Sequence, residues 1–189
     1  MRLTRRPLSA MLEVTDSAVV MISLLLFFDS ENLLPVFLIA AALHELGHLA
    51  ALRLCGGKLR RLRLSAVGGR MDCVMPEDRA RCFFIHFAGA AMNFAAFALF
   101  RLLDLPLLAG ANFVLSIFNL LPVCPLDGYA CIEALSGERL PHAAEWLGTG
   151  FTILLSLFGI WIFYVGNGLS LAVIGLSLTV FSCKNLQKN

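Results

Sequence analysis

The sequence predicts an all-α membrane protein with six transmembrane helices. Three observations lead to this prediction: an apolar composition, long uncharged runs and the placement of the positive charge. Hydrophobic residues make up 59% of the 189 residues and charged residues 15%, and the mean hydropathy is +0.81. Soluble domains are about 45–50% apolar and about 25% charged. Because a soluble domain cannot bury so much apolar surface, the composition excludes a secreted disulfide scaffold, a disordered chain and a soluble nucleic-acid-binding protein.

The uncharged runs are long enough to cross a bilayer, whose hydrocarbon core takes roughly 20 helical residues. Residues 82–100 and 105–126 contain no Asp, Glu, Lys or Arg, and residues 146–183 form a longer uncharged stretch that the turn at 166–168 divides. We therefore expect one polytopic membrane domain over residues 1–189. Its six expected spans cover approximately 8–28, 33–55, 81–103, 105–136 with an interruption near 122–127, 146–165 and 168–183.

Lysine and arginine gather before the first span, between the second and third spans, and after the last span. The residues concerned are Arg2, Arg5, Arg6, Lys58, Arg60, Arg61, Arg63, Arg70, Arg79, Arg81, Lys184 and Lys188. With six spans these three segments fall on one side, which the positive-inside rule makes the cytoplasm. We expect a multi-pass protein of a bacterial cytoplasmic membrane with both termini cytoplasmic. The alternative, a cleaved signal peptide at the N-terminus, is disfavoured because no convincing small-residue cleavage site follows.

Two histidines and a glutamate lie inside the second expected span, in the string His44-Glu45-Leu46-Gly47-His48. Because His44 and His48 are four residues apart, both imidazoles project from one face of a helix. This spacing suits two ligands of a tetrahedral Zn²⁺, with Glu45 beside them to polarise a metal-bound water. Such side chains are costly in a membrane helix unless they are paired. The alternative is a pair of structural histidines that hydrogen-bond to another helix.

A catalytic zinc needs a third protein ligand and keeps one coordination position open. Asp127 is the candidate, because it follows Pro122 and Pro125, two prolines that interrupt a helix in the fourth span. Backbone freed by that break must face protein or a water-filled cavity, where a carboxylate can point inward. Two alternatives stay open: Asp127 as the N-cap of a following helix, and Cys124 as a thiolate ligand.

The basic loop between the second and third spans contains a strand-like segment. Residues 62–75 begin with alternating apolar and polar side chains and turn at Gly68-Gly69. This pattern predicts a short cytoplasmic β-hairpin. The alternative is an amphipathic basic loop that lies on anionic lipid.

These residues resemble a known family, the site-2 proteases, which are intramembrane zinc metalloproteases. The string from His44 to His48 matches the family's HExxH helix, and residues 119–128, an Asn and a Pro followed by Leu-Asp-Gly, match its second motif. Gly89 and Asn93 look like a third motif, although Ala90 stands where that motif often has Pro. The resemblance covers about half of the chain and is strongest to the sporulation-type branch (stage IV sporulation protein FB). That branch often has a CBS domain after the last span, and we expect none here.

The resemblance implies a zinc metalloendopeptidase that holds one zinc per chain. It assigns His44, His48 and Asp127 as the metal ligands and Glu45 as the catalytic general base. Zinc and Glu45 would activate a water for attack on a peptide carbonyl, and Glu45 would pass the proton to the leaving amine.

The resemblance also implies auxiliary residues. Asn93 and Asn119 are implied as polar helpers near the site, and for Asn93 a purely interhelical hydrogen bond is an equal alternative. The family has an element comparable to the hairpin. By that likeness the hairpin would bind the extended substrate as an added strand, with Gly68 and Gly69 as substrate-binding residues.

The expected substrate is a membrane-tethered or membrane-associated protein that is cut within or near the bilayer, such as a sigma-factor-like precursor or its regulator. The expected partners are this substrate, the lipid bilayer and a membrane regulator, with no nucleic acid. Two other functions are weighed. A membrane metal transporter would show more polar residues along the later spans or repeated half-motifs. An inactive protease-like chaperone would not need all four expected catalytic residues.

Overall fold

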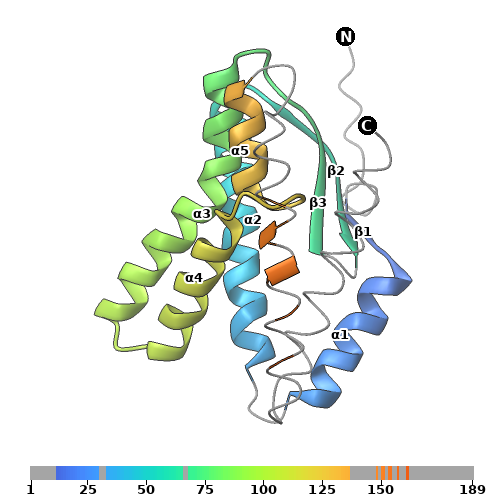
Figure 1. Cartoon of the computed structure of the whole chain (residues 1–189), viewed down its shortest axis with the longest axis vertical. Coiled ribbons are helices and arrows are strands. Elements are labelled where there is room, and N and C mark those ends of the chain that lie inside the picture. The colour runs from blue at the N-terminus through green and yellow to red at the C-terminus, as the bar shows by residue number, and fades with distance from the viewer. Residues whose placement is uncertain are drawn as a thin grey trace, which may run out of the picture.

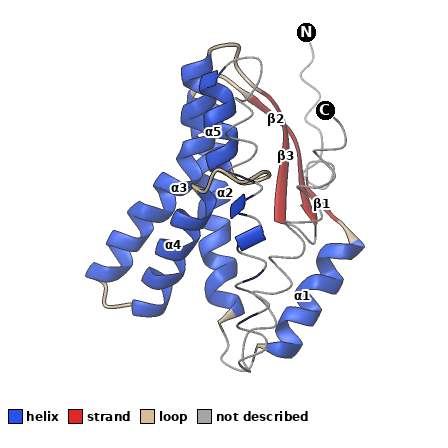
Figure 2. Ribbon diagram, viewed as in Figure 1, coloured by secondary structure: helices blue, strands red, loops and turns tan. Residues whose placement is uncertain are grey.

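The computed structural model describes residues 12–29, 33–65 and 68–136, together with positions 148, 150, 151, 153, 154, 157 and 161. Within these residues the chain is mostly helical and carries one small three-stranded sheet (Figure 1 and Figure 2). The elements are β1 (Leu12–Val14), α1 (Asp16–Phe28), α2 (Leu34–Leu54), β2 (Lys58–Ser65), β3 (Gly68–Val74), α3 (Arg79–Leu102), α4 (Pro106–Asn119) and α5 (Asp127–Ser136).

A mostly helical chain with a hairpin after the second helix is therefore confirmed. Most of the expected span 146–165 and all of the expected span 168–183 lie outside the described residues. Among the described residues, α2 and α3 are long and apolar enough to cross a membrane, and α1 and α4 are shorter apolar helices. The count of six spans stays a prediction.

The N-terminal segment differs from the expected continuous span over 8–28. A short strand, β1, pairs parallel with β2, and α1 begins only at Asp16. Thr15 lies where the strand ends and the helix begins. Its backbone N–H and its hydroxyl both donate to the carbonyl of Leu64, at 3.0 and 2.9 Å. The same hydroxyl caps the start of α1. The difference has a long-range cause, because β1 exists only by pairing with a strand about fifty residues away.

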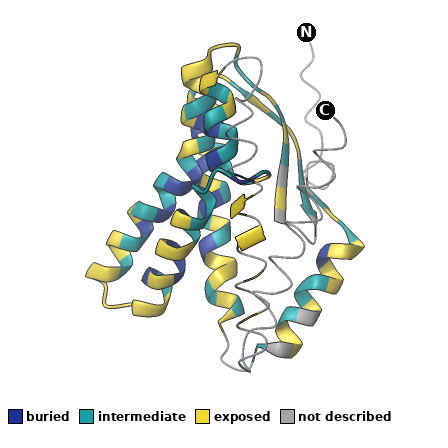
Figure 3. Ribbon diagram, viewed as in Figure 1, coloured by how far each residue is buried: buried dark blue, intermediate teal, exposed yellow. Residues whose placement is uncertain are grey.

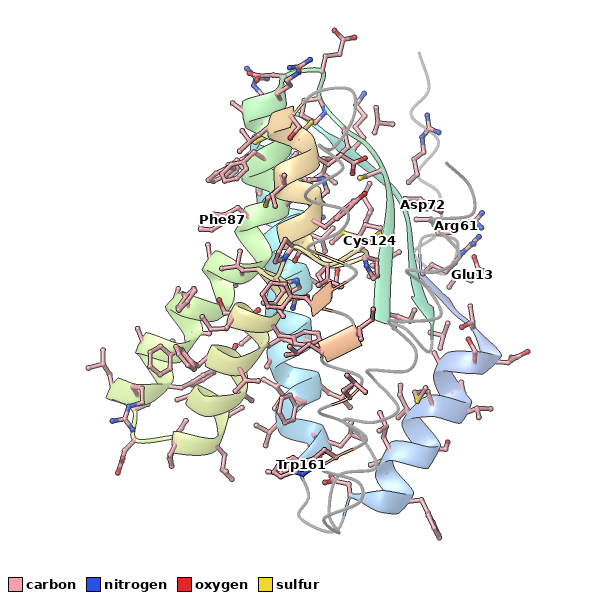
Figure 4. All side chains as sticks on the ribbon, viewed as in Figure 1. Glu13, Arg61, Asp72, Phe87, Cys124 and Trp161 are labelled. Carbon is pink, nitrogen blue, oxygen red and sulfur yellow. The ribbon has the colours of Figure 1, made fainter. Side chains whose placement is uncertain are left out.

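An ion-pair cluster lies beside this pairing. The Oε2 atom of Glu13 accepts from Arg61 at 3.0 Å and from Arg63 at 3.3 Å, and Figure 4 shows Glu13 and Arg61 at neighbouring positions. All three side chains are more than 40% exposed, so these bonds contribute little to stability. The pairs agree with the register of β1 on β2, in which Glu13 lies opposite Arg63.

The hairpin begins at Lys58, earlier than the alternation from residue 62 indicated. β2 and β3 pair antiparallel, with Ser65 opposite Gly68 at the turn end. The register shifts between Leu59 and Arg61, where β2 contains one extra residue. A bulge of this kind breaks the two-residue period. The first part of β2 was therefore hidden from a pattern that looks for strict alternation.

The helices pack through small residues. A Cβ added to Gly47 of α2 would lie 2.6 Å from the carbonyl oxygen of Ala88 in α3, so the two backbones are in contact there. α3 also packs against α4 and α5 and is the centre of the helical layer. Figure 3 shows buried residues where the helices meet and exposed residues on their outer faces. Large apolar side chains stand on these outer faces, including Leu54 (82% exposed) and Leu102 (85%).

The break in the expected fourth span lies between α4 and α5. Val123 is fully buried and anchors the connecting loop, and the Cys124–Pro125 peptide is cis. Gly128 packs so closely against the carbonyl of Leu120 that no side chain would fit. The loop thereby turns back and places the first residue of α5, Asp127, towards α2.

We predict that Gly47→Ala destabilises the protein by about 1–3 kcal/mol, because the new methyl group would force α2 away from α3. Thermal unfolding of the purified protein in detergent micelles measures this loss. Gly110→Ala in α4 is the matched control, since no atom lies within 4 Å of its added Cβ. That substitution should be neutral or stabilising. An unfolding temperature for Gly47→Ala equal to that of Gly110→Ala would contradict the close packing.

Candidate metal centre

Two imidazoles from α2 form the base of the site. His44 and His48 lie one helical turn apart and are 7% and 8% exposed. Their rings meet edge to face with centroids 4.6 Å apart, and their Nε2 atoms are 3.0 Å apart. The helical spacing read from the sequence therefore does bring both rings to one point.

The other ring nitrogens face oxygen atoms of α3. Nδ1 of His44 lies 2.7 Å from Oδ1 of Asn93, and Nδ1 of His48 lies 2.8 Å from the carbonyl oxygen of Ile85. Both oxygens accept hydrogen bonds, so the proton of each neutral imidazole belongs on Nδ1. Each Nε2 then carries a lone pair, which is the form that binds a metal.

A carboxylate from α5 completes the group. The Oδ2 atom of Asp127 is 2.8 Å from Nε2 of His44 and 3.1 Å from Nε2 of His48. With both imidazole protons on Nδ1, three lone pairs converge here and no hydrogen atom lies between them. In this tautomer the three lone pairs repel one another, and a cation between them would remove the repulsion.

The donor set fits zinc. Two imidazoles and one carboxylate are a known catalytic set, which leaves one position open. Ligand atoms about 2.0–2.1 Å from a tetrahedral zinc lie ~3.3 Å from one another. The distances between Nε2 of His44, Nε2 of His48 and Oδ2 of Asp127 are 2.8–3.1 Å, so small movements would accommodate the ion. Among the described residues this is the group of His, Cys, Asp and Glu side chains that could hold a metal, and Cys124 is not part of it.

Glu45 lies beside the three donors and within electrostatic range of His44, His48 and Asp127. The hairpin reaches it: a Cβ added to Gly69 would lie 2.7 Å from Oε1 of Glu45. The predicted turn is thus in contact with the predicted catalytic carboxylate. A side chain at Gly69 would displace that carboxylate, which gives a physical reason for glycine at this position.

One more small residue, Gly89, is explained by close approach. α3 passes so near to the imidazoles at Gly89 that a side chain there would overlap both His44 and His48. The sequence had pointed to Gly89 as part of a possible motif, and the structure shows that its lack of a side chain leaves room for the rings.

The auxiliary residues have different positions. Asn93 is fully buried and contacts His44 directly, while it also bridges two helices by donating to the carbonyl of Ala40 at 2.9 Å. Both readings of this residue therefore apply. Asn119 ends α4 and donates to the carbonyl of Leu115 in its own helix at 3.0 Å. No hydrogen bond from Asn119 to the three donors is found among the described residues.

The sequence analysis missed two contributors. The carbonyl of Ile85 gave no signal, because backbone groups carry none in a sequence. Asn112 in α4 is fully buried and accepts at 2.7 Å from Nδ2 of Asn93. An amide in the middle of an uncharged apolar span was the signal that could have identified it.

A cavity of about 790 Å³ opens beside the hairpin. It is lined by Arg60, Arg61, Met71, Asp72, Cys73, Met75 and His86. His86, which lines the cavity, is half-buried and lies within electrostatic range of Asp127 and His48.

Comparison with known proteins shows a likeness among the solved structures. No protein-family model and no curated protein matches the chain. Among solved structures, the site-2 protease from Methanocaldococcus jannaschii is similar, with a TM-score of 0.67 and 23% sequence identity. The match covers 92% of this chain and 89% of that one. At this identity the likeness shows the fold alone: the chain has the fold of that protein over nearly its whole length.

Proposed function

We propose that this protein is an intramembrane zinc metalloendopeptidase of the site-2 protease type. The observation that carries the proposal is the convergence of Nε2 of His44, Nε2 of His48 and Oδ2 of Asp127, with Glu45 beside them. The fold shared with the site-2 protease from Methanocaldococcus jannaschii and the hairpin that contacts Glu45 support the proposal. A structural histidine pair would not need a carboxylate aimed at both Nε2 atoms.

Membrane embedding is part of the same proposal. The composition, the two long apolar helices α2 and α3, and the large apolar side chains on their outer faces all support it. His44 and His48 lie within α2, so the metal centre would lie below the membrane surface. The further details, namely six spans, cytoplasmic termini and a bacterial cytoplasmic membrane, rest on the distribution of Lys and Arg.

The residues of this chain divide the chemistry between them. His44, His48 and Asp127 would hold the ion, and a bound zinc supplies the polarisation of a water and of the scissile carbonyl. Glu45 accepts the proton from the attacking water and passes it to the leaving amine. Asn93 and the carbonyl of Ile85 keep both imidazoles aimed at one point throughout.

Substrate binding is assigned to the hairpin. β1 covers the outer edge of β2, and within the described residues the other edge of β3 carries no strand. An extended substrate added to β3 would pass Gly69 and so lie beside Glu45. Gly68 pairs with Ser65 at the turn and would flank the same path.

A membrane-tethered or membrane-associated protein is the substrate class that fits this placement. A sigma-factor-like precursor or its regulator is the specific candidate, and a membrane-bound regulator of the protease would be a further partner. These assignments and the sporulation-type branch rest on the sequence resemblance.

Metal analysis of the purified protein should find about one zinc per chain. Asp127→Ala should lose most of the metal, because two imidazoles alone cannot complete the site. Cys124→Ala is the matched control, since Cys124 lies in the adjacent loop but outside the donor group (Figure 4). Loss of zinc from Cys124→Ala, with retention by Asp127→Ala, would show the ligand assignment to be wrong.

Glu45→Gln should abolish cleavage in co-expression with single-span substrates, read as a size shift. The amide keeps the volume of the carboxylate but cannot accept the proton, and loss of a general base costs about 10²–10⁴-fold. Zinc content and unfolding temperature should stay close to those of the unmodified protein. Full cleavage by this variant would remove the protease mechanism and favour the transporter or chaperone functions.

Reporter fusions test the topology. A reporter at either terminus or within residues 56–80 should give a cytoplasmic signal, and a reporter after Glu31 or Asn167 an external one. The reason is the placement of Lys and Arg. An external signal from residues 56–80, which contain the hairpin, would overturn the orientation and the entry of substrate from the cytoplasmic side.

A further inference from the structure

Asn112 is a buried amide that the proposed chemistry does not use. It lies in the middle of α4 and is 0% exposed. The other residues of this helix are almost all apolar. A buried amide is costly unless its hydrogen-bonding groups are satisfied. Both ends of the side chain are satisfied here: Nδ2 donates to the carbonyl of Leu108 at 2.8 Å, and Oδ1 accepts from Asn93 at 2.7 Å.

The hydrogen bonds from α4 to the metal centre run in one direction. The carbonyl of Leu108 can only accept, so it orients the nitrogen of Asn112 towards itself and leaves Oδ1 for Asn93. Asn93 then uses Nδ2 as the donor, both to Asn112 and to the carbonyl of Ala40. Its Oδ1 is left to face Nδ1 of His44 at 2.7 Å.

Each amide orientation is thus determined by the one before it. If Asn93 were turned over, its nitrogen would face Nδ1 of His44 and its oxygen would face the oxygens of Ala40 and Asn112. The contacts between oxygens would be repulsive, because none of the three oxygens carries a proton to donate. The chain therefore places the proton of His44 on Nδ1 and the lone pair on Nε2.

We propose that Asn112 is a positioning residue for the metal centre, which acts through Asn93 to fix the tautomer and ring orientation of His44. This inference rests on the proposed function of the site as a metal centre. The second ligand does not depend on the same network, because His48 is oriented by the backbone of Ile85. Asn112 should therefore affect one imidazole and not the other.

The helix that carries Asn112 also leads to the third ligand. α4 leads through the loop at Val123 to Asp127 at the start of α5. The helix therefore supports His44 through the hydrogen bonds of Asn112 and Asn93, and it supports Asp127 through the backbone. The position of α4 is thereby coupled to two of the three ligands.

Ser116 provides a matched control. It lies one turn after Asn112 in α4, is also 0% exposed, and also donates to α3, to the carbonyl of Ala90 at 2.9 Å. No described hydrogen bond links it to His44. Ser116→Ala removes a buried α4–α3 hydrogen bond and leaves the chain to the metal centre intact.

The first measurement is zinc affinity by competition with a chelator, on the full-length protein in detergent micelles. Asn112→Leu should weaken zinc binding about tenfold, which is the lower end of the effect of groups that orient a metal ligand. Ser116→Ala should bind zinc as tightly as the unmodified protein.

The second measurement is histidine ¹⁵N NMR of the metal-free protein, which reports the tautomer of each ring. In the unmodified protein, at a pH that keeps both imidazoles neutral, the oxygens of Asn93 and Ile85 should hold the protons of His44 and His48 on Nδ1. In Asn112→Leu the signal of His44 should change to a mixture of tautomers while that of His48 stays. Changes at both rings would indicate a general loss of structure and would contradict the proposal.

The outcomes separate this proposal from the proposed function. An unchanged His44 tautomer in Asn112→Leu, or equal losses of affinity in Asn112→Leu and Ser116→Ala, would overturn the positioning role while leaving the metal centre intact. If Asp127→Ala binds zinc as well as the unmodified protein does, the metal centre itself fails. A selective change at His44 in the metal-free protein would still support the hydrogen-bond chain in that case.

Discussion

The rest of the structure depends on one constraint: three lone pairs must meet inside a layer of apolar helices. Nε2 of His44, Nε2 of His48 and Oδ2 of Asp127 approach to about hydrogen-bond distance, and the partners of both Nδ1 atoms favour imidazole protons that lie away from this point. Without a cation this arrangement is repulsive, and in apolar surroundings the repulsion is stronger than in water. The fold must therefore hold these three atoms together through groups outside the donor set, which contact the opposite side of each imidazole.

α3 supplies most of that support, and its small residues make it possible. Contact with α2 at Gly47 and Gly89 brings the backbone of α3 close enough for Ile85 and Asn93 to reach the far nitrogens of both imidazoles. A bulkier pair of helices would separate the rings from their acceptors. Close packing and ligand orientation are therefore the same requirement, and a loss of one should appear as a loss of the other.

Much of the site could be predicted because its signals are local. The spacing of His44 and His48 is a property of one helix. The prolines before Asp127 indicate a break in a helix whatever surrounds them. Asn112 and β1 could not be predicted in the same way, since their partners are distant in sequence and only the fold brings them near. Asn119 is the opposite case. The motif indicated a role near the site, but in the structure its side-chain N–H donates to a carbonyl of its own helix.

The hairpin links the sheet to the chemistry. The edge strands of the described sheet are β1, which has three residues, and β3, which has seven and contacts Glu45 at Gly69. The N-terminal strand thus does more than extend the sheet. It covers β2 and leaves β3 as the longer free edge, which is the edge beside Glu45. An extended backbone is also what peptide cleavage needs, since the hydrogen bonds of a helix shield the carbonyl. Under the proposed function, the short strand that interrupts the first apolar segment directs an extended substrate to β3 and so towards Glu45.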